Sequence, residues 1–243
     1  ETKEGGFFNR QNRQTTRVEW QETYHFIPPS LVGGSHSSKI GINLVHHSYD
    51  GGYVMMPVEI LRASGVPAER LDFGPPAKVS IHQNEATAFY SDKWTIHSQI
   101  TLDLGLRLDH DSLTGSSQFS PRLGFALVPT KGSRTVLRGG IGVFYDKVNL
   151  NAKAFESYPD RTVTSFDAEG LLTGKVRYVQ MMAGRLRNPR SVAWNGEVER
   201  ELASNLALRI GYQQRETTRD FLVNPAVFSG MNCLLLSNSG RSR

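Results

Sequence analysis

Hydrophobic and polar residues alternate strictly in the middle of the chain. Between Thr101 and Asp109 every even position is leucine, while the odd positions are Thr, Asp, Gly, Arg and Asp. A period of two places all the leucines on one face of a β-strand, whereas a helix would spread them around its circumference. The same alternation recurs in residues 119–128 and 135–146. The pattern therefore predicts three consecutive β-strands, each with one apolar and one polar face.

Further segments on both sides of these strands repeat the pattern. They comprise residues 17–26, 39–46, 81–94, 192–199 and 206–213, with a weaker candidate at 176–182. The faces of residues 81–94 are mixed, so their register is poorly defined. Pro28 and Pro29 end the first strand, because consecutive prolines cannot donate to a ladder. The chain is thus predicted to be all-β, with about eight to ten antiparallel strands.

Short and long connections between the predicted strands alternate along the chain. Short turns are expected near residues 28–38, 96–99, 129–133 and 202–205, and longer, irregular ones near 48–80, 110–118, 147–190 and beyond 216. In an up-and-down meander, alternate connections lie at opposite ends of the sheet. One end then carries tight turns and the other long loops, which is typical of outer-membrane barrels and not of a soluble sandwich. The loop at 147–188 is expected to be extracellular and mobile.

Composition narrows the class of protein further. The 38% hydrophobic content suits a soluble protein and also a transmembrane barrel, in which only alternate residues face lipid. A transmembrane helix is excluded, because no run of about 18 apolar residues exists. The net charge of +5 comes from basic residues spaced singly along strands, including Arg107, Arg122, Arg138 and Arg209. This spacing indicates a charged lumen wall and argues against nucleic-acid binding.

The cysteine content and the first residues bear on the chain's context. Cys233 is the single cysteine, so neither an internal disulfide nor a cysteine-based zinc site is expected. Residues 1–4 have neither the basic nor the apolar region of a signal peptide. For an exported protein this leads us to expect that residues 1–243 are a segment of a longer chain.

Two groups of histidines and carboxylates have the chemistry of metal ligands. They are His46 and His47 with Asp50, and the run Asp109–Asp111, which contains His110. Imidazole and carboxylate suit divalent ions. Both groups, however, lie where predicted strands pass into loops, a place where polar residues collect in any case. We therefore predict no metal or cofactor site.

Other candidate motifs are also better explained by a barrel wall. The glycine-rich run Arg138–Gly142 lacks the lysine and the following helix of a phosphate-binding loop, so its glycines are interpreted as relieving crowding in a strand. Glu197, Glu199 and Asp103 have the residue type of paired catalytic carboxylates, but their positions on polar strand faces favour ion pairs across the lumen wall. The predicted partners are Arg107, Arg122, Arg138 and Arg209. Without a nucleophile–base motif, no catalytic residue and no enzyme activity are predicted. The residues that bind a ligand stay unassigned.

Aromatic residues near strand ends or on apolar faces suggest contact with the membrane interface. Amphipathic rings favour the headgroup level and form girdles around outer-membrane barrels; ordinary sheet packing is the alternative. The residues are Trp20, Tyr24, Trp94, Tyr145, Trp194 and Tyr212.

Several motifs follow one another in an order that resembles a known family. They are Phe89–Trp94, Leu102–Asp109, Phe119–Phe125, Val136–Asp146, Leu186–Asn195 and Val198–Leu202. Together they resemble the barrel of TonB-dependent outer-membrane receptors, and in particular the Oar-like group, which carries a carboxypeptidase-regulatory-like domain. Barrels of this kind have about 22 strands and a plugged lumen. The plug, the TonB box and the regulatory-like domain have no counterpart in these residues.

The resemblance implies uptake of a bulky nutrient across the outer membrane of a Gram-negative type of cell. The implied partners are outer-membrane lipid and the TonB system, reached through the missing N-terminal part, while the transported ligand is unknown. Residues 1–243 would then be part of a large transmembrane outer-membrane β-barrel. Two alternatives stay open from the residues alone. One is an independent small barrel of structural or adhesive role, and the other is a soluble β-sandwich that binds carbohydrate or protein.

Overall fold

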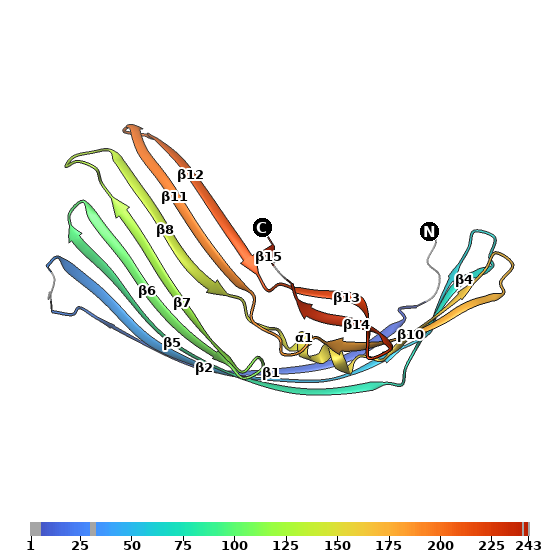
Figure 1. Ribbon diagram of the computed structural model, residues 1–243. Coiled ribbons are helices and arrows are strands. Elements are labelled where there is room, and N and C mark those ends of the chain that lie inside the picture. The colour runs from blue at the N-terminus through green and yellow to red at the C-terminus, as the bar shows by residue number, and fades with distance from the viewer. Residues whose placement is uncertain (1–5, 30–32, 240, 243) are drawn as a thin grey trace.

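The computed structural model describes residues 6–29, 33–239 and 241–242. Most of these residues form strands, with one short helix, α1 (Leu150–Ala154), and a 3-10 turn, η1 (Phe155–Ser157) (Figure 1). The all-β prediction is confirmed. In chain order the strands are β1 (Asn9–Phe26), β2 (Ser35–Met55), β3 (Val58–Leu61), β4 (Pro67–Phe73), β5 (Ala77–His97), β6 (Ile100–Asp111), β7 (Ser116–Leu127), β8 (Thr135–Tyr145), β9 (Arg161–Phe166), β10 (Leu172–Met182), β11 (Arg190–Ala203), β12 (Leu206–Thr218), β13 (Phe221–Phe228), β14 (Met231–Asn238) and β15 (Arg241–Ser242).

The larger sheet is an antiparallel meander. Within the described residues its strand order is β1-β2-β5-β6-β7-β8-β11-β12-β15, so each long strand pairs with the next strand along the chain that belongs to the same sheet. It curves into a trough, with β1 at one edge and β12, joined briefly by β15, at the other. We call this curved nine-stranded sheet the wall (Figure 1). No described residues of β1 pair with β12, so the sheet is an arc and not a closed cylinder.

The wall strands differ in length by almost a factor of two. β2 and β5 have 21 residues each, whereas β6, β7 and β8 have 12, 12 and 11. At about 3.3 Å per residue, β2 and β5 extend roughly 70 Å. The hydrocarbon core of a bilayer is only about 30 Å thick. The halves of β1, β2 and β5 that lie away from the tight turns therefore project beyond a membrane that the shorter strands just cross.

A second sheet lies at the long-loop end of the wall. Its strand order is β13-β14-β10-β9-β4-β3, and it combines hairpins from three different connections. β14 pairs in parallel with β10, which joins the connection after β12 to the connection between β8 and β11. The β13–β14 hairpin turns at Ser229 and Gly230, both with positive φ, as a two-residue hairpin with matching twist requires. Pro225 lies in β13, an edge strand that tolerates a missing N–H donor.

This second sheet corrects the expectation of long irregular loops. Residues 48–80 consist of the end of β2, the β3–β4 hairpin and the start of β5, and residues 147–190 contain α1, η1, β9 and β10. The region beyond 216 holds the β13–β14 hairpin, and the loop expected at 110–118 is a turn between Asp111 and Ser116. The prediction of irregular structure was wrong because local hairpin pairing, together with ladder partners from other connections, holds these strands without a periodic apolar face.

Strand ends differ from expectation in a similar way. β1 begins at Asn9 rather than at residue 17, because the polar residues 9–16 pair with residues 48–55 of β2. Ser35–Ser38, expected as a turn, begins β2. The turns near 96–99, 129–133 and 202–205 and the end of the first strand before Pro28 are confirmed. Residues 30–32 of the expected 28–38 turn, and residues 1–4, lie outside the described residues.

The direction in which each face of the wall points follows from α1. This helix lies on the concave side of the wall (Figure 1), where Ala154 packs on Tyr49, Tyr53 and Val79. Odd positions of β2 and β5 therefore point inward. Ladder partners share a face, so the pairing of Thr87 with Asp109 places the odd, charged positions of β6 inside and its leucines on the convex side.

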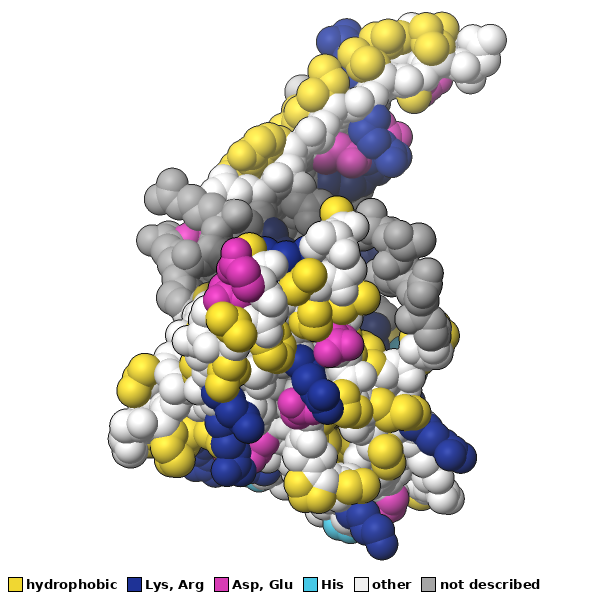
Figure 2. All heavy atoms as spheres, turned by 90° about the vertical axis from the view of Figure 1, so that its right-hand side faces the viewer, with side chains coloured by type: hydrophobic (Ala, Val, Ile, Leu, Met, Phe, Trp, Pro, Cys, Tyr) yellow, Lys and Arg dark blue, Asp and Glu magenta, His cyan; other side chains and the backbone are white. Residues whose placement is uncertain are grey.

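Large apolar side chains on the convex face are exposed. Leu104 is 38% exposed, Leu108 50% and Ile141 52%. The arm at the top of Figure 2, which is the β11–β12 end in Figure 1, carries an apolar stripe on one side and charged side chains on the other. A continuous exposed apolar face of this size needs a nonaqueous partner. Within the described ranges, no helix is both long and apolar enough to span a membrane.

Candidate functional site: the concave wall and the loop roots

Arginines and glutamates form a network on the concave face near the tight-turn end. Arg138 of β8 donates to Glu199 at 2.6 Å and to Glu197 at 3.3 Å. Arg209 of β12 approaches the same two glutamates at 2.8 and 3.4 Å. The ladder places these residues on adjacent strands with the same orientation. The predicted ion pairing of these carboxylates with Arg138 and Arg209 is confirmed.

The other two arginines proposed for this network have different partners. Arg107 donates to both oxygens of Asp109, two residues along its own strand, at 2.7–3.0 Å. Arg122 lies over the ring of Phe144, with 4.7 Å between the guanidinium carbon and the ring centroid. Asp103 is on β6, and both β7 and β8 lie between it and the β11 glutamates. The structure therefore does not bring the three acids together as a catalytic pair would require.

The glycine-rich run lies inside β8 and not before a helix, so it is not a phosphate-binding loop. Gly140 and Gly142 line a groove of about 480 Å³ on the concave face, together with Gly105 and Gly124 of neighbouring strands. A Cβ atom on Gly140 would come within 3.1 Å of the Leu123 carbonyl oxygen. The glycines thus allow the strands to approach and leave the wall hollow at this level.

A smaller cavity, of about 110 Å³, lies where the β8–β11 connection leaves and rejoins the wall. Lys147, at the outgoing root, forms an ion pair with Glu85 of β5, whose side chain is only 8% exposed. His47 lies 3.7 Å from the other oxygen of that carboxylate. Asp146 pairs with Arg215 of β12 at 3.2 Å. The outgoing root is therefore held by charges from two wall strands, β5 and β12.

The returning root is held by a buried hydrogen-bond network. Asn188 is 5% exposed, and its side-chain oxygen accepts from Thr114 at 2.9 Å and from Gln118 at 2.8 Å. Its amide group donates to the Asp146 carbonyl oxygen at 3.1 Å, which ties the two roots together. Val148, 1% exposed, packs with Leu186 and Leu236 beside them. Both roots of this connection are anchored to the concave wall.

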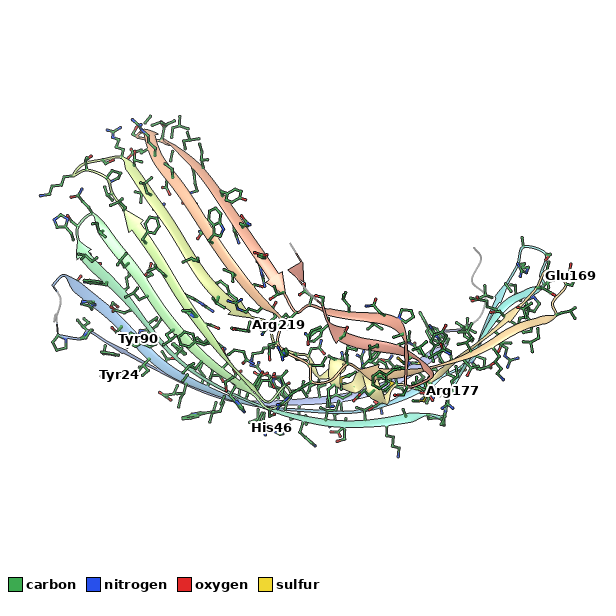
Figure 3. All side chains as sticks on the ribbon, in the orientation of Figure 1. Tyr24, His46, Tyr90, Glu169, Arg177 and Arg219 are labelled. Atoms are coloured by element: carbon green, nitrogen blue, oxygen red, sulfur yellow. The ribbon has the colours of Figure 1, made fainter. Side chains whose placement is uncertain are left out.

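The histidine candidates for a metal site are separated by strand alternation. His46 stacks on His82, with 5.9 Å between ring centroids, and lies on the convex side (Figure 3). His47 lies on the concave side, where it approaches Glu85. In the second group Asp109 and Asp111 face inward, and His110 contacts Ser117 of the next strand at 3.1 Å. Among the residues that the structure describes, no three His, Cys, Asp or Glu side chains are placed to hold a metal ion.

The convex face carries most of the aromatic candidates for a girdle. Trp20, Tyr24 and Tyr212 are 53%, 66% and 59% exposed, and Trp194 lies 5.2 Å from Tyr212. Figure 3 shows Tyr24 on the convex side near the tight turns. Trp94 donates its indole N–H to the Gly33 carbonyl oxygen at 2.9 Å beside the first turn. Tyr145 differs, because it lines the cavity at the loop roots.

One polar cluster interrupts the convex face. Asp92 is 6% exposed and accepts hydrogen bonds from Ser38 at 2.7 Å and from His36, also at 2.7 Å. The hydroxyl of Ser38 is 3.2 Å from that of Tyr90. This cluster explains the mixed faces of residues 81–94, since an acid occupies an outward position and is satisfied by the neighbouring strand.

Sequence reasoning missed the residues that build the cavity at the loop roots. Glu85, Lys147, Asn188 and Gln118 come from two wall strands and from both ends of one connection. None of them belongs to the candidate catalytic or metal-binding groups that the sequence offered. Their proximity depends on strand pairing over tens of residues, which the alternation of apolar positions does not encode.

The chain matches the family model of the outer membrane beta barrel domain over residues 112–227, from the β6–β7 turn into β13. The fold is that of an outer-membrane β-barrel. The family match and the fold together locate the chain in the outer membrane of a Gram-negative type of cell. No curated protein sequence matches the chain significantly.

Solved structures of outer-membrane transporters and receptors share this fold. The outer membrane transporter YddB from Escherichia coli is 14% identical, with a TM-score of 0.64 over 95% of this chain and 29% of that chain. A mutant of the ferric enterobactin receptor PfeA from Pseudomonas aeruginosa is 15% identical, with a TM-score of 0.52 over 96% and 40%. The siderophore receptor PirA from Pseudomonas aeruginosa is 14% identical, with a TM-score of 0.51 over 95% and 45%. The chain thus spans less than half the length of these proteins.

Proposed function

We propose that the chain is part of a TonB-dependent receptor that takes up a bulky nutrient across the outer membrane. The observation that carries the proposal is the curved wall, with an apolar convex face, a charged concave face and a sheet of hairpins at one end only. A wall of this kind separates lipid from an aqueous lumen. The arc also requires further strands to close, which fits a barrel of about 22 strands better than one of eight.

The nutrient class and the energy source rest on the sequence resemblance and on the solved structures. The motif order between residues 89 and 202 resembles TonB-dependent receptors of the Oar-like group. Two of the solved structures are siderophore or ferric enterobactin receptors. Siderophores are therefore the first ligand class to test, followed by glycans and peptides. The TonB system would act through a part of the receptor outside residues 1–243.

Uptake measurements on cells that carry the complete gene test this proposal. Deletion of the gene is expected to abolish accumulation of one labelled nutrient from these classes. The same loss is expected when the proton gradient is collapsed or when TonB is deleted, because the outer membrane has no energy source of its own. Accumulation that depends on the gene but persists without TonB would contradict energy-coupled uptake and favour a passive barrel.

The independent small barrel makes the opposite prediction for the 243-residue chain alone. In the arc, β1 and β12 leave backbone N–H and C=O groups that lipid cannot satisfy. The chain refolded in detergent is expected to aggregate or to associate with copies of itself. A monodisperse monomer with heat-modifiable migration on gels would support the independent small barrel. It would contradict the proposal that residues 1–243 are a segment of a large barrel.

A further inference from the structure

The cavity at the loop roots contains one carboxylate oxygen without a hydrogen-bond partner. Asp111 is 5% exposed, and its Oδ1 accepts from the Gln83 side chain at 2.9 Å and from the Leu113 backbone N–H at 2.8 Å. The second oxygen, Oδ2, is shielded from solvent and has no donor within hydrogen-bonding distance. An unpaired carboxylate oxygen in a buried position is costly. Oδ2 is therefore free to accept a hydrogen bond from a group that enters the cavity.

The charges around Asp111 favour a cation as that group. Glu85 and Asp111 are direct ladder partners, so their side chains leave the sheet side by side. Arg107 is already committed to Asp109, and Lys147 to Glu85. Asp146, the third carboxylate with a cationic partner, pairs with Arg215. Asp111 is thus the one carboxylate of the cavity lining that forms no ion pair with a described residue.

The size of the cavity and the arrangement of its ligating groups narrow the kind of cation. A volume of about 110 Å³ holds one small head group and not a whole nutrient. In the described part of the chain no three acidic or histidine side chains have metal-site geometry. A cation with N–H groups satisfies Asp111 through a charge-assisted hydrogen bond without a full coordination shell.

We propose that this cavity is a subsite for one primary ammonium or guanidinium group carried by a larger ligand. The inference rests on the proposed function, because it assumes that the ligand passes along the concave face. Lys147 provides the same chemistry from within the chain, because its ammonium group pairs with Glu85. The lysine side chain is 56% exposed, so it can leave the cavity without unpacking the wall, whereas Glu85 cannot. Lys147 therefore competes with the ligand for the carboxylates.

The test measures binding of small probes to the complete receptor purified in detergent, without TonB or an energy source. The probes are ethylammonium and methylguanidinium, with tetramethylammonium, urea and Ca²⁺ as comparisons, and calorimetry gives each Kd. Asp111→Asn keeps the shape and the Oδ1 acceptor but replaces Oδ2 by a donor. This variant is expected to raise the Kd of both N–H cations by about tenfold or more, which corresponds to the loss of one charge-assisted hydrogen bond. Asp103→Asn, a concave acid outside this cavity, is the matched control and is expected to change nothing.

A second variant protects the test against simple misfolding. Lys147→Met removes the internal competitor and is expected to tighten binding of both probes severalfold. Damage to the fold would instead weaken probe binding in both variants alike. The proposal is overturned if Asp111→Asn binds like Asp103→Asn, if tetramethylammonium or urea binds as well as ethylammonium, or if Ca²⁺ alone shows the Asp111 dependence. Because no transport is measured, failure here leaves TonB-dependent uptake untouched, and failure of uptake leaves this binding result valid.

Discussion

The wall and the hairpin sheet are both built of antiparallel strands, but they are stabilised differently. In the wall, β6 to β12 pair with consecutive neighbours, and large apolar residues such as Leu104 and Ile141 stay exposed on one face until lipid covers them. In the hairpin sheet, strands from three connections meet, and Cys233 and Leu236 are buried against the chain itself. The wall depends on its surroundings for burial, whereas the hairpin sheet depends on contacts between distant segments.

The ladder pattern reflects the same difference. Most wall partners follow one another across short turns, and β2–β5, β8–β11 and β12–β15 are the pairs joined by long connections. In the long wall strands the alternation of side chains specifies which residues face the lipid. The parallel pairing of Val179–Met182 with Cys233–Leu236 joins segments more than fifty positions apart. No alternation of apolar and polar residues predicts this pairing. A strand without periodicity can thus be as well formed as a periodic one when its hydrogen bonds are supplied from elsewhere.

The largest difference between the two regions is expected in protease access on intact cells. The tip of the β9–β10 hairpin, residues 167–171, lies far from the wall, as Glu169 marks in Figure 3. The turn at residues 130–133 lies at the opposite end of the wall. Added protease is expected to cut at the hairpin tip and to spare the turn, because the proposed topology places only the hairpin tip at the cell exterior. Fragment masses identify the cut, and cleavage at the turn in preference to the tip would invert the topology.

The next effect concerns the convex face of the wall. Leu104→Arg in the complete, folding-competent barrel is expected to cost about 2–4 kcal/mol if the residue lies near the bilayer midplane. Leu172→Arg, at a residue that is 63% exposed in the hairpin sheet, is the matched control, and it carries no lipid penalty. Unfolding in liposomes gives both free energies. Equal costs for the two variants would remove the distinction between a lipid-facing wall and a water-facing sheet.

The returning loop root is expected to give a smaller effect. Asn188→Ala leaves Thr114 and Gln118 without their shared acceptor, which costs about 1–3 kcal/mol for buried polar groups. The connection between β8 and β11 is then expected to be cut faster by protease, while the wall strands stay intact. Asn224→Ala, at an exposed residue of β13, is the control. Unchanged cleavage in Asn188→Ala would show that the root does not anchor the connection.

The smallest effect concerns pH and the contact between α1 and the wall. Burial raises the pKa of Tyr53 above its usual value, and hydrogen bonds with Tyr49 and Tyr158 add to the shift. Tyr53 lies in the part of β2 that projects beyond the membrane. Because the neutral phenol is favoured in the fold, its contribution is complete below the unfolded pKa of about 10 and is lost as pH rises above it.

Ultraviolet titration of tyrosine ionisation measures this effect. In the complete receptor, ionisation of Tyr53 is expected to begin at a higher pH than that of a tyrosine in water, with loosening of α1 at the same pH. Tyr53→Phe serves as the control, because it keeps the packing and removes the titrating group. Ionisation of all tyrosines in a single step near the ordinary value would contradict the buried cluster.

The sequence by itself determined the wall. Alternation at Leu102–Leu108 and in neighbouring segments identified the strands, their faces and the tight turns, because side-chain orientation in a strand has a period of two. A continuous apolar face is favourable where the strand contacts lipid. It also identified the pairing of Glu197 and Glu199 with arginines, since charges on the polar faces of neighbouring strands meet across the ladder.

Only the tertiary structure decided the rest. The full length of β1, β2 and β5, the hairpin sheet and the cavity around Asp111 all depend on pairs of residues far apart in the chain. Lys147 and Asn188 become neighbours of the wall because both ends of one connection return to the same place. A local pattern reports which way a side chain faces. Which other side chain it meets depends on register and closure, and these are global properties of the folded chain.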